Sequence, residues 1–208
     1  MEDIYCYSYV EDAPSAAVAK KLVAQRNSVL AHKLHFREGF PALTGGYSAL
    51  EKKCPSFLLM ANGGLYTFSI TDLDTRTCAV DLIRDWFCIP TVQPVALPKE
   101  VVFRVAVREV EAWIMADREA WAKYIGIPAE NFSNLPDTLP DPKRHLLNVI
   151  RRKGMKRVHK EMLPNGTAHI GPRYNEVLCN FVSAKWSPSR ASCNSPSLKR
   201  AIDALHRL

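Results

Sequence analysis

Apolar and β-branched stretches alternate with helical patterns along the first 126 residues. Four stretches rich in aromatic and β-branched side chains predict buried strands, at 4–10, 34–40, 65–71 and 101–107. Apolar residues at helical spacing predict helices over 16–30, over 47–61, around 80–87 and from about 109 to 125. Because strands and helices alternate, the sequence predicts an α/β fold with a mostly parallel sheet and helices on its faces.

Two of these helices have an apolar side that predicts which residues are buried. In the helix over 16–30, Val18 and Leu22 lie on the apolar side, and Arg26 is expected to be exposed. In the helix after the strand at 65–71, the spacing i, i+3, i+7 predicts a buried stripe of Val80, Ile83 and Phe87.

The last third of the chain is predicted to be helical. Four prolines between 128 and 142 indicate a long loop, and Asp141 with Pro142 is typical of a helix start, here of a helix that runs to about 153. Further helices are expected after Gly171-Pro172 and after Ser195-Pro196. We therefore predict an α/β domain over 1–126 and a helical extension over 127–208 that packs on it.

Acidic residues follow three of the predicted strands. They are Glu11 after the first strand, Asp72 and Asp74 after the third, and Glu109 and Glu111 after the fourth. The carboxyl ends of parallel strands share one edge of the sheet, where ligands bind in open α/β folds. Alternate strand residues share a face, so Asp72 and Asp74 are expected to point at one spot. Carboxylates this close repel unless a cation lies between them, and oxygen ligands suit Mg²⁺ or Mn²⁺.

Each of these acids also has a simpler interpretation. Aspartate is common in turns and at helix N-termini, and glutamate is favoured in a first helical turn by the helix dipole. If Glu109 and Glu111 both lie in a helix, their side chains diverge by about 200° and only one can face the site. If Glu109 is still extended, both can face it.

A stretch from 143 to 160 contains basic residues and no acid. Its members are Lys143, Arg144, Arg151, Arg152, Lys153, Lys156, Arg157 and Lys160. The formal net charge of the chain is +7 and the sequence pI is about 9.2, which favours a polyanionic partner. We predict that the stretch contacts nucleic-acid phosphates, with a solvated basic face or a docking surface for an acidic protein as alternatives.

Composition excludes several other classes of protein. The six cysteines form no Cys-x-x-Cys pair, so neither a zinc knuckle nor a redox motif is indicated. No apolar run reaches the ~18 residues of a membrane span, and the first residues lack the basic start of a signal peptide. We therefore expect a cytoplasmic protein without a membrane partner. No glycine-rich phosphate loop is present either.

The strand-end acids resemble the Toprim signature of topoisomerases, primases and nucleases of the overcoming-lysogenization-defect (OLD) type. The matching residues are Glu11 in YSYVEDAPSAAVAKKLV, and Asp72 and Asp74 in FSITDLDTRTC. Toprim nucleases usually carry a second acid four residues after the glutamate, where Ser15 stands here. Later segments, FRVAVREVEAWIMADREAWAKYIGIP among them, resemble a family of small bacterial proteins often encoded beside an AAA or ABC-type ATPase in defence-like operons.

These observations predict a metal-dependent phosphodiesterase, a nuclease, that acts on DNA or RNA with an ATPase partner in phage defence. Glu11, Asp72 and Asp74 would hold Mg²⁺ or Mn²⁺, with Glu109 or Glu111 completing the site, and Arg76 or Arg108 would neutralise charge on the reacting phosphate. The alternative is a non-catalytic, Toprim-like regulatory subunit of an ATPase. A nucleotide-binding or phosphotransfer enzyme is a third, weaker interpretation.

Overall fold

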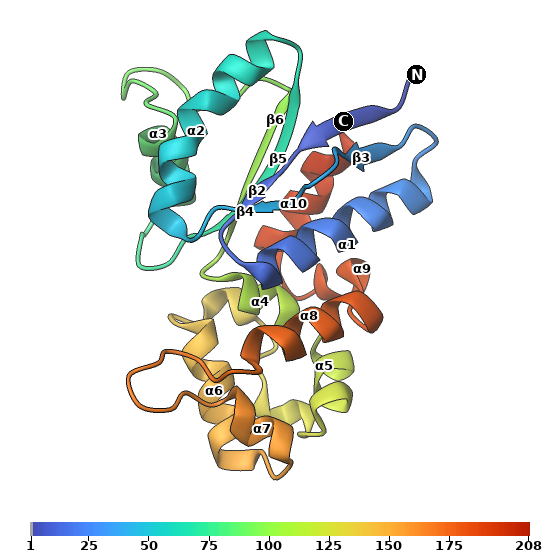
Figure 1. The fold of residues 1–208 in the computed structure, drawn as a ribbon, viewed down its shortest axis with the longest axis vertical. Coiled ribbons are helices and arrows are strands. Elements are labelled where there is room, and N and C mark those ends of the chain that lie inside the picture. Colours follow the sequence, from blue (N-terminus) through green and yellow to red (C-terminus); the bar gives the residue numbers. More distant parts are fainter. Residues whose placement is uncertain (1) are drawn as a thin grey trace.

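The structure is a computed structural model that describes residues 2–208, and it has the α/β architecture predicted from the sequence (Figure 1). Its six-stranded sheet consists of β1 (Ile4–Tyr7), β2 (Tyr9–Val10), β3 (Leu34–Phe36), β4 (Ala42–Leu43), β5 (Tyr66–Asp72) and β6 (Val101–Ala106). The pairs β1–β3, β1–β5, β2–β4, β2–β5 and β5–β6 are all parallel.

The first strand and its neighbour are both interrupted. The predicted strand over 4–10 is divided at Ser8 into β1 and β2, and both parts pair with β5. The predicted strand over 34–40 is shorter than expected, and the chain rejoins the sheet as β4. In effect β5 lies between the β1–β2 strand and β6, and β6 is an edge strand.

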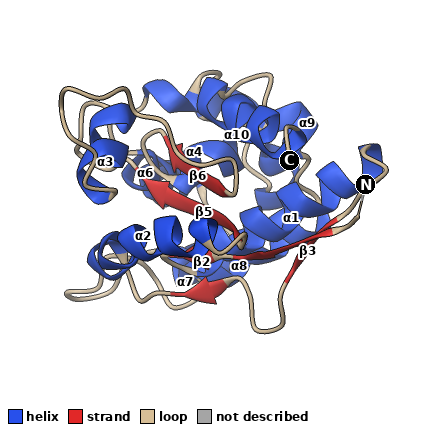
Figure 2. Ribbon diagram, turned by 90° about the horizontal axis from the view of Figure 1, so that it is seen from above, coloured by secondary structure: helices blue, strands red, loops and turns tan. Residues whose placement is uncertain are grey.

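Helices cover both faces of this sheet (Figures 1 and 2). They are α1 (Ala13–Val29), α2 (Tyr47–Asn62), α3 (Ala79–Trp86), α4 (Val110–Met115), α5 (Arg118–Ile125), α6 (Pro142–Lys153), α7 (Arg157–Met162), α8 (Tyr174–Ala184), α9 (Pro188–Ala191) and α10 (Pro196–His206). The side chains of β6 alternate between the two faces. Phe103 packs with α2 and α3, whereas Val102 and Ala106 join the larger core that contains α1, α8 and α10.

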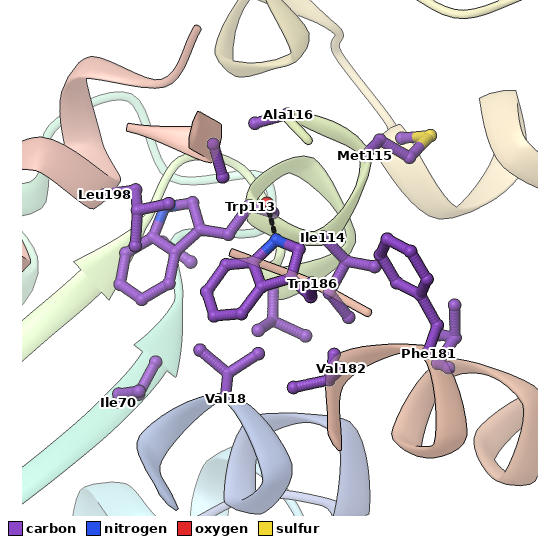
Figure 3. Close-up of a cluster of buried hydrophobic side chains, with 14 of the residues drawn as sticks. Val18, Ile70, Trp113, Ile114, Met115, Ala116, Phe181, Val182, Trp186 and Leu198 are labelled. Carbon is purple, nitrogen blue, oxygen red and sulfur yellow. Dashed lines mark hydrogen bonds between the residues drawn. The ribbon is translucent and has the colours of Figure 1, made fainter. Parts of the chain in front are cut away.

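The larger core joins segments that are far apart in the sequence (Figure 3). Trp113 of α4 and Trp186, which follows α8, are both buried, and the Trp186 indole N–H donates to the Trp113 carbonyl at 3.1 Å. The Trp113 indole in turn donates to Ser197 Oγ of α10 at 2.6 Å. Residues before and after position 126 thus share one hydrophobic core, in which α8 and α10 pack on α1 and α10 packs on β6.

Two predictions about helix faces are wrong in part. Phe87 is buried as predicted and Ile83 packs against the same core, but Val80 is 51% exposed, and α3 also buries Leu82 and Trp86. Arg26 is buried, because its guanidinium donates from Nε to the Leu205 carbonyl at 2.9 Å and so links α1 to α10. No helix within residues 2–208 is long and apolar enough to cross a membrane.

Candidate functional site

The structure brings the acids of three strand ends together at the carboxyl edge of the sheet. Glu11 follows β2, and its Oε1 accepts hydrogen bonds from Thr71 Oγ1 at 2.5 Å and from the backbone N–H of Asp72 at 3.1 Å. Asp72 ends β5, and its Oδ1 accepts the backbone N–H of Val110 at 2.8 Å, where α4 begins after β6. The two carboxylates therefore tie the ends of neighbouring strands to one another.

Glu109 and Glu111 both face this site. Glu109 is extended, with φ −140° and ψ 158°, and precedes the first turn of α4, so its side chain does not follow the helical rotation. Lys143 Nζ lies 3.7 Å from Glu109 Oε1 and 3.5 Å from Glu111 Oε1. Glu109 Oε2 also accepts the backbone N–H of Lys143 at 2.7 Å, in the first turn of α6. Of the two arrangements open from the sequence, the structure has the one in which both glutamates converge.

Glu111 is the most deeply buried of these acids, with 1% of its surface exposed. Its Oε1 accepts a hydrogen bond from the Tyr174 hydroxyl at 3.0 Å. Its Oε2 is buried and has no hydrogen-bond partner within residues 2–208. A buried carboxylate oxygen without a donor is costly, so Glu111 leaves an acceptor free for a proton or a cation.

Burial and mutual repulsion shift the titration of the site. Burial raises the pKa of Glu111 to about 7, opposed by Lys143 and reinforced by Glu109. Burial, then the charges of Glu111 and Glu11, raise the pKa of Asp72 well above its ordinary value. Burial also raises the pKa of Glu11. Without a further cation, the cluster holds more negative charge than it can stably carry.

Lys143 is the cation within this cluster. Burial alone would lower its pKa, but the carboxylates of Glu111, Glu109 and Asp72 outweigh that effect and raise it, so the ammonium stays charged. The sequence predicts that Lys143 contacts nucleic acid, whereas the structure places its ammonium among the acids. Tyr174 was not predicted at all, because it lies in α8, far along the chain from the strand ends.

Asp74 does not share the environment of Asp72. The strand ends at Asp72, and Asp74 has a left-handed backbone with φ 51°, held by its N–H donating to the Arg108 carbonyl at 2.9 Å. Strand alternation therefore does not set the direction of the Asp74 side chain, and the expectation that it points with Asp72 at one spot stays a prediction. Asp74 is exposed at the rim, although burial of its carboxylate raises its pKa and its charge contributes to the raised pKa of Glu11.

Three other residues near the site make local contacts. Arg76 donates from Nε to the Tyr47 hydroxyl at 3.0 Å and pairs with Asp85 at 2.6 Å. Arg108 donates to the carbonyl oxygens of Asp74 and Arg76, at 3.2 and 2.5 Å. The hydrogen bonds of both guanidinium groups thus stabilise the loop after β5. Asp12 caps α1 by accepting the backbone N–H of Ser15.

The rest of the basic stretch forms an exposed surface on α6, α7 and the turn between them. This basic surface consists of Arg144, Arg151, Arg152, Lys153, Lys156, Arg157 and Lys160. Arg157 pairs with Glu161 at 2.6 Å. Because α6 begins at the acidic site with Lys143, its last turn lies roughly 14 Å away at 1.5 Å per residue.

The donor chemistry of the site suits a hard cation, because every candidate ligand is a carboxylate oxygen. The unpartnered Glu111 Oε2 and the raised pKa values of Glu11 and Asp72 fit such an ion. As they stand, however, no three Asp, Glu, His or Cys side chains in the described part of the chain are close enough together to hold a metal. Binding of an ion would require the side chains to move closer together.

No family model, curated protein or solved structure matches this chain. The resemblance to Toprim and OLD-type nucleases therefore stays a prediction.

Proposed function

We propose that the protein is a divalent-metal-dependent phosphodiester hydrolase that acts on nucleic acid. The observation that carries the proposal is a set of acids gathered at the carboxyl edge of a parallel sheet: Asp72 and Glu111, which are buried, and Glu11, which is half-buried. Their pKa values are raised, and perturbed groups at such an edge are typical of functional sites. A Mg²⁺ or Mn²⁺ ion there would relieve the repulsion.

The residues divide into ligands and an orienting cation. Glu11 and Asp72 would hold the ion, with Glu109 or Glu111 completing its shell. The ion would supply an activated water and would stabilise charge on the phosphate oxygens. Lys143 fixes Glu109 and Glu111 in place, and its ammonium can also attract a phosphate oxygen of the substrate.

The basic surface would hold the nucleic-acid backbone. Its side chains are exposed and extend from the acidic site along α6 to α7. Contacts of this kind bind phosphates without reading the bases, so they support a role in affinity for DNA or RNA.

The second candidate is a non-catalytic regulatory subunit, and one observation favours it. Lys143 already neutralises part of the charge of Glu109 and Glu111, as a structural lysine would. An ATPase partner, and a place in phage defence, are proposals that rest on the resemblance of the later sequence segments.

A cleavage assay separates the two candidates. Purified protein is incubated with end-labelled single-stranded DNA, duplex DNA and RNA, in Mn²⁺, in Mg²⁺ or in EDTA. We expect metal-dependent cleavage by the wild type and by the control Asp81→Asn, whose side chain is exposed on α3. Asp72→Asn should be inactive. Absence of cleavage in every condition, or full activity in Asp72→Asn, would favour the regulatory subunit.

A further inference from the structure

A cavity of about 560 Å³ lies along the open edge of β6, remote from the acidic site. Its walls are Val101–Arg104 of β6, the segment 95–99, and Ala204 and Arg207 of α10. None of the residues that line the cavity belongs to the acidic site. The cavity is therefore a separate site.

Arg104 contributes a guanidinium to this cavity from the edge strand. It lies on the same face of β6 as Val102 and Ala106, the face that α10 covers. Its Nε is buried and has no hydrogen-bond partner within residues 2–208. A buried donor without an acceptor is costly, so this position lacks an acceptor that a ligand could supply.

Two more arginines face Arg104 from α10. Arg200, Ala204 and Arg207 occupy positions i, i+4 and i+7, so they share one side of the helix. Arg200 and Arg207 are exposed, and neither forms an ion pair within the described chain. Burial, then the charges of Arg207 and Arg200, lower the pKa of Arg104. Arg104 and Arg207 line the cavity together with Lys99, and no Asp or Glu side chain lines it. Arg200 lies outside the lining, but its charge also acts on Arg104.

Apart from Lys99, the other side chains of the cavity wall are largely apolar. Tyr66, Ile83, Val95 and Leu97 line it beside the cationic end. A volume of this size is within the ~300–1,000 Å³ range of pockets that bind small molecules. The cavity therefore combines a place for an anionic group with a place for a flat or apolar body.

We propose that this cavity binds a small phosphate ester of mononucleotide size. Guanidinium groups bind phosphate because their paired N–H donors match its oxygen atoms. The Arg104 Nε–H has no acceptor within residues 2–208, and a phosphate oxygen would supply one. Arg207 and Lys99, which also line the cavity, supply the further positive charge that a phosphate dianion balances. The base or another apolar body would lie against Tyr66 and Leu97.

Isothermal titration calorimetry with AMP, adenosine and inorganic phosphate tests this inference, in EDTA so that no divalent ion occupies the acidic site. We expect AMP to bind more tightly than phosphate, and adenosine to bind at least tenfold more weakly than AMP. Arg207→Gln and Arg104→Gln should each weaken AMP binding at least tenfold. The control Lys52→Gln, whose side chain is exposed on α2, should bind as the wild type does.

Two results would overturn the inference: no heat of binding with millimolar AMP or phosphate, or unchanged affinity in Arg207→Gln. Because Arg207 is exposed, Arg207→Gln should fold as the wild type does. Its affinity for AMP therefore tests the inference even if Arg104→Gln is poorly folded. Asp72→Asn should retain AMP binding, so failure here is distinct from failure of the proposed hydrolase.

Discussion

Replacing Glu111 with glutamine should stabilise the metal-free protein at alkaline pH. The pKa of Glu111 is raised from 4.5 to about 7 by burial, with Glu109 and Asp12 adding to the shift and Lys143 opposing it. A carboxyl with a raised pKa in the folded state contributes stability that is complete below its unfolded pKa. That contribution is lost as the pH rises through the folded pKa.

The magnitude follows from the size of the shift. At 1.36 kcal/mol per pKa unit, ionisation of Glu111 costs the fold about 3 kcal/mol above pH 8. Because the group is already partly ionised in the unfolded chain at pH 5, the free energy of unfolding should fall by about 2 kcal/mol or slightly more between pH 5 and pH 8. Glutamine cannot ionise, and its Oε1 can still accept the Tyr174 hydroxyl, so the variant should lose this slope.

Urea unfolding in EDTA at pH 5, 6, 7 and 8 measures both proteins. A matched control is Glu176→Gln: Arg173 lowers the pKa of Glu176, which stays ionised throughout this range. The control should therefore keep the wild-type slope. If Glu111→Gln keeps that slope, or is less stable than the wild type at pH 8, the assignment of a strained, charged Glu111 is wrong.

Three further results are expected. Asp72→Asn should be as stable as the wild type in urea unfolding, because its Oδ1 can still accept the Val110 N–H. Asp72→Ala leaves that donor unpaired, so its free energy of unfolding should be about 1–3 kcal/mol lower. Millimolar Mn²⁺ should raise the melting temperature of the wild type and not of Asp72→Asn; an equal shift in both would place the ion elsewhere. Replacing Arg151, Arg152 and Lys156 with Gln should weaken nucleic-acid binding. It should also reduce the slope of log binding constant against log salt concentration by ~0.7–0.9 per lost phosphate contact. An unchanged slope would show that these residues do not contact phosphate.

The strand-end acids could be predicted because sheet topology alone brings them together. Glu11, Asp72 and Glu109 each follow a strand of a parallel sheet, and adjacent parallel strands end at the same edge. The fold class followed from the same alternation of strands and helices.

The remaining features depend on tertiary contacts that periodicity does not encode. Lys143 and Tyr174 reach the site from α6 and α8, whose packing on the sheet domain is set by the shared core. The left-handed backbone of Asp74 removes it from the strand, and no local pattern requires that turn at an aspartate. Arg26 is buried where α10 supplies the Leu205 carbonyl from the far end of the chain and His32 supplies a second carbonyl acceptor.

A crystal structure of the wild type grown or soaked in Mn²⁺ tests the proposed metal site most directly. We predict an anomalous-scattering peak between Glu11 and Asp72, with Glu109 or Glu111 turned toward it, and no such peak in Asp72→Asn. An empty site at high Mn²⁺ concentration, with Lys143 still paired with Glu109 and Glu111, would contradict the proposal that this acidic edge serves metal-dependent hydrolysis.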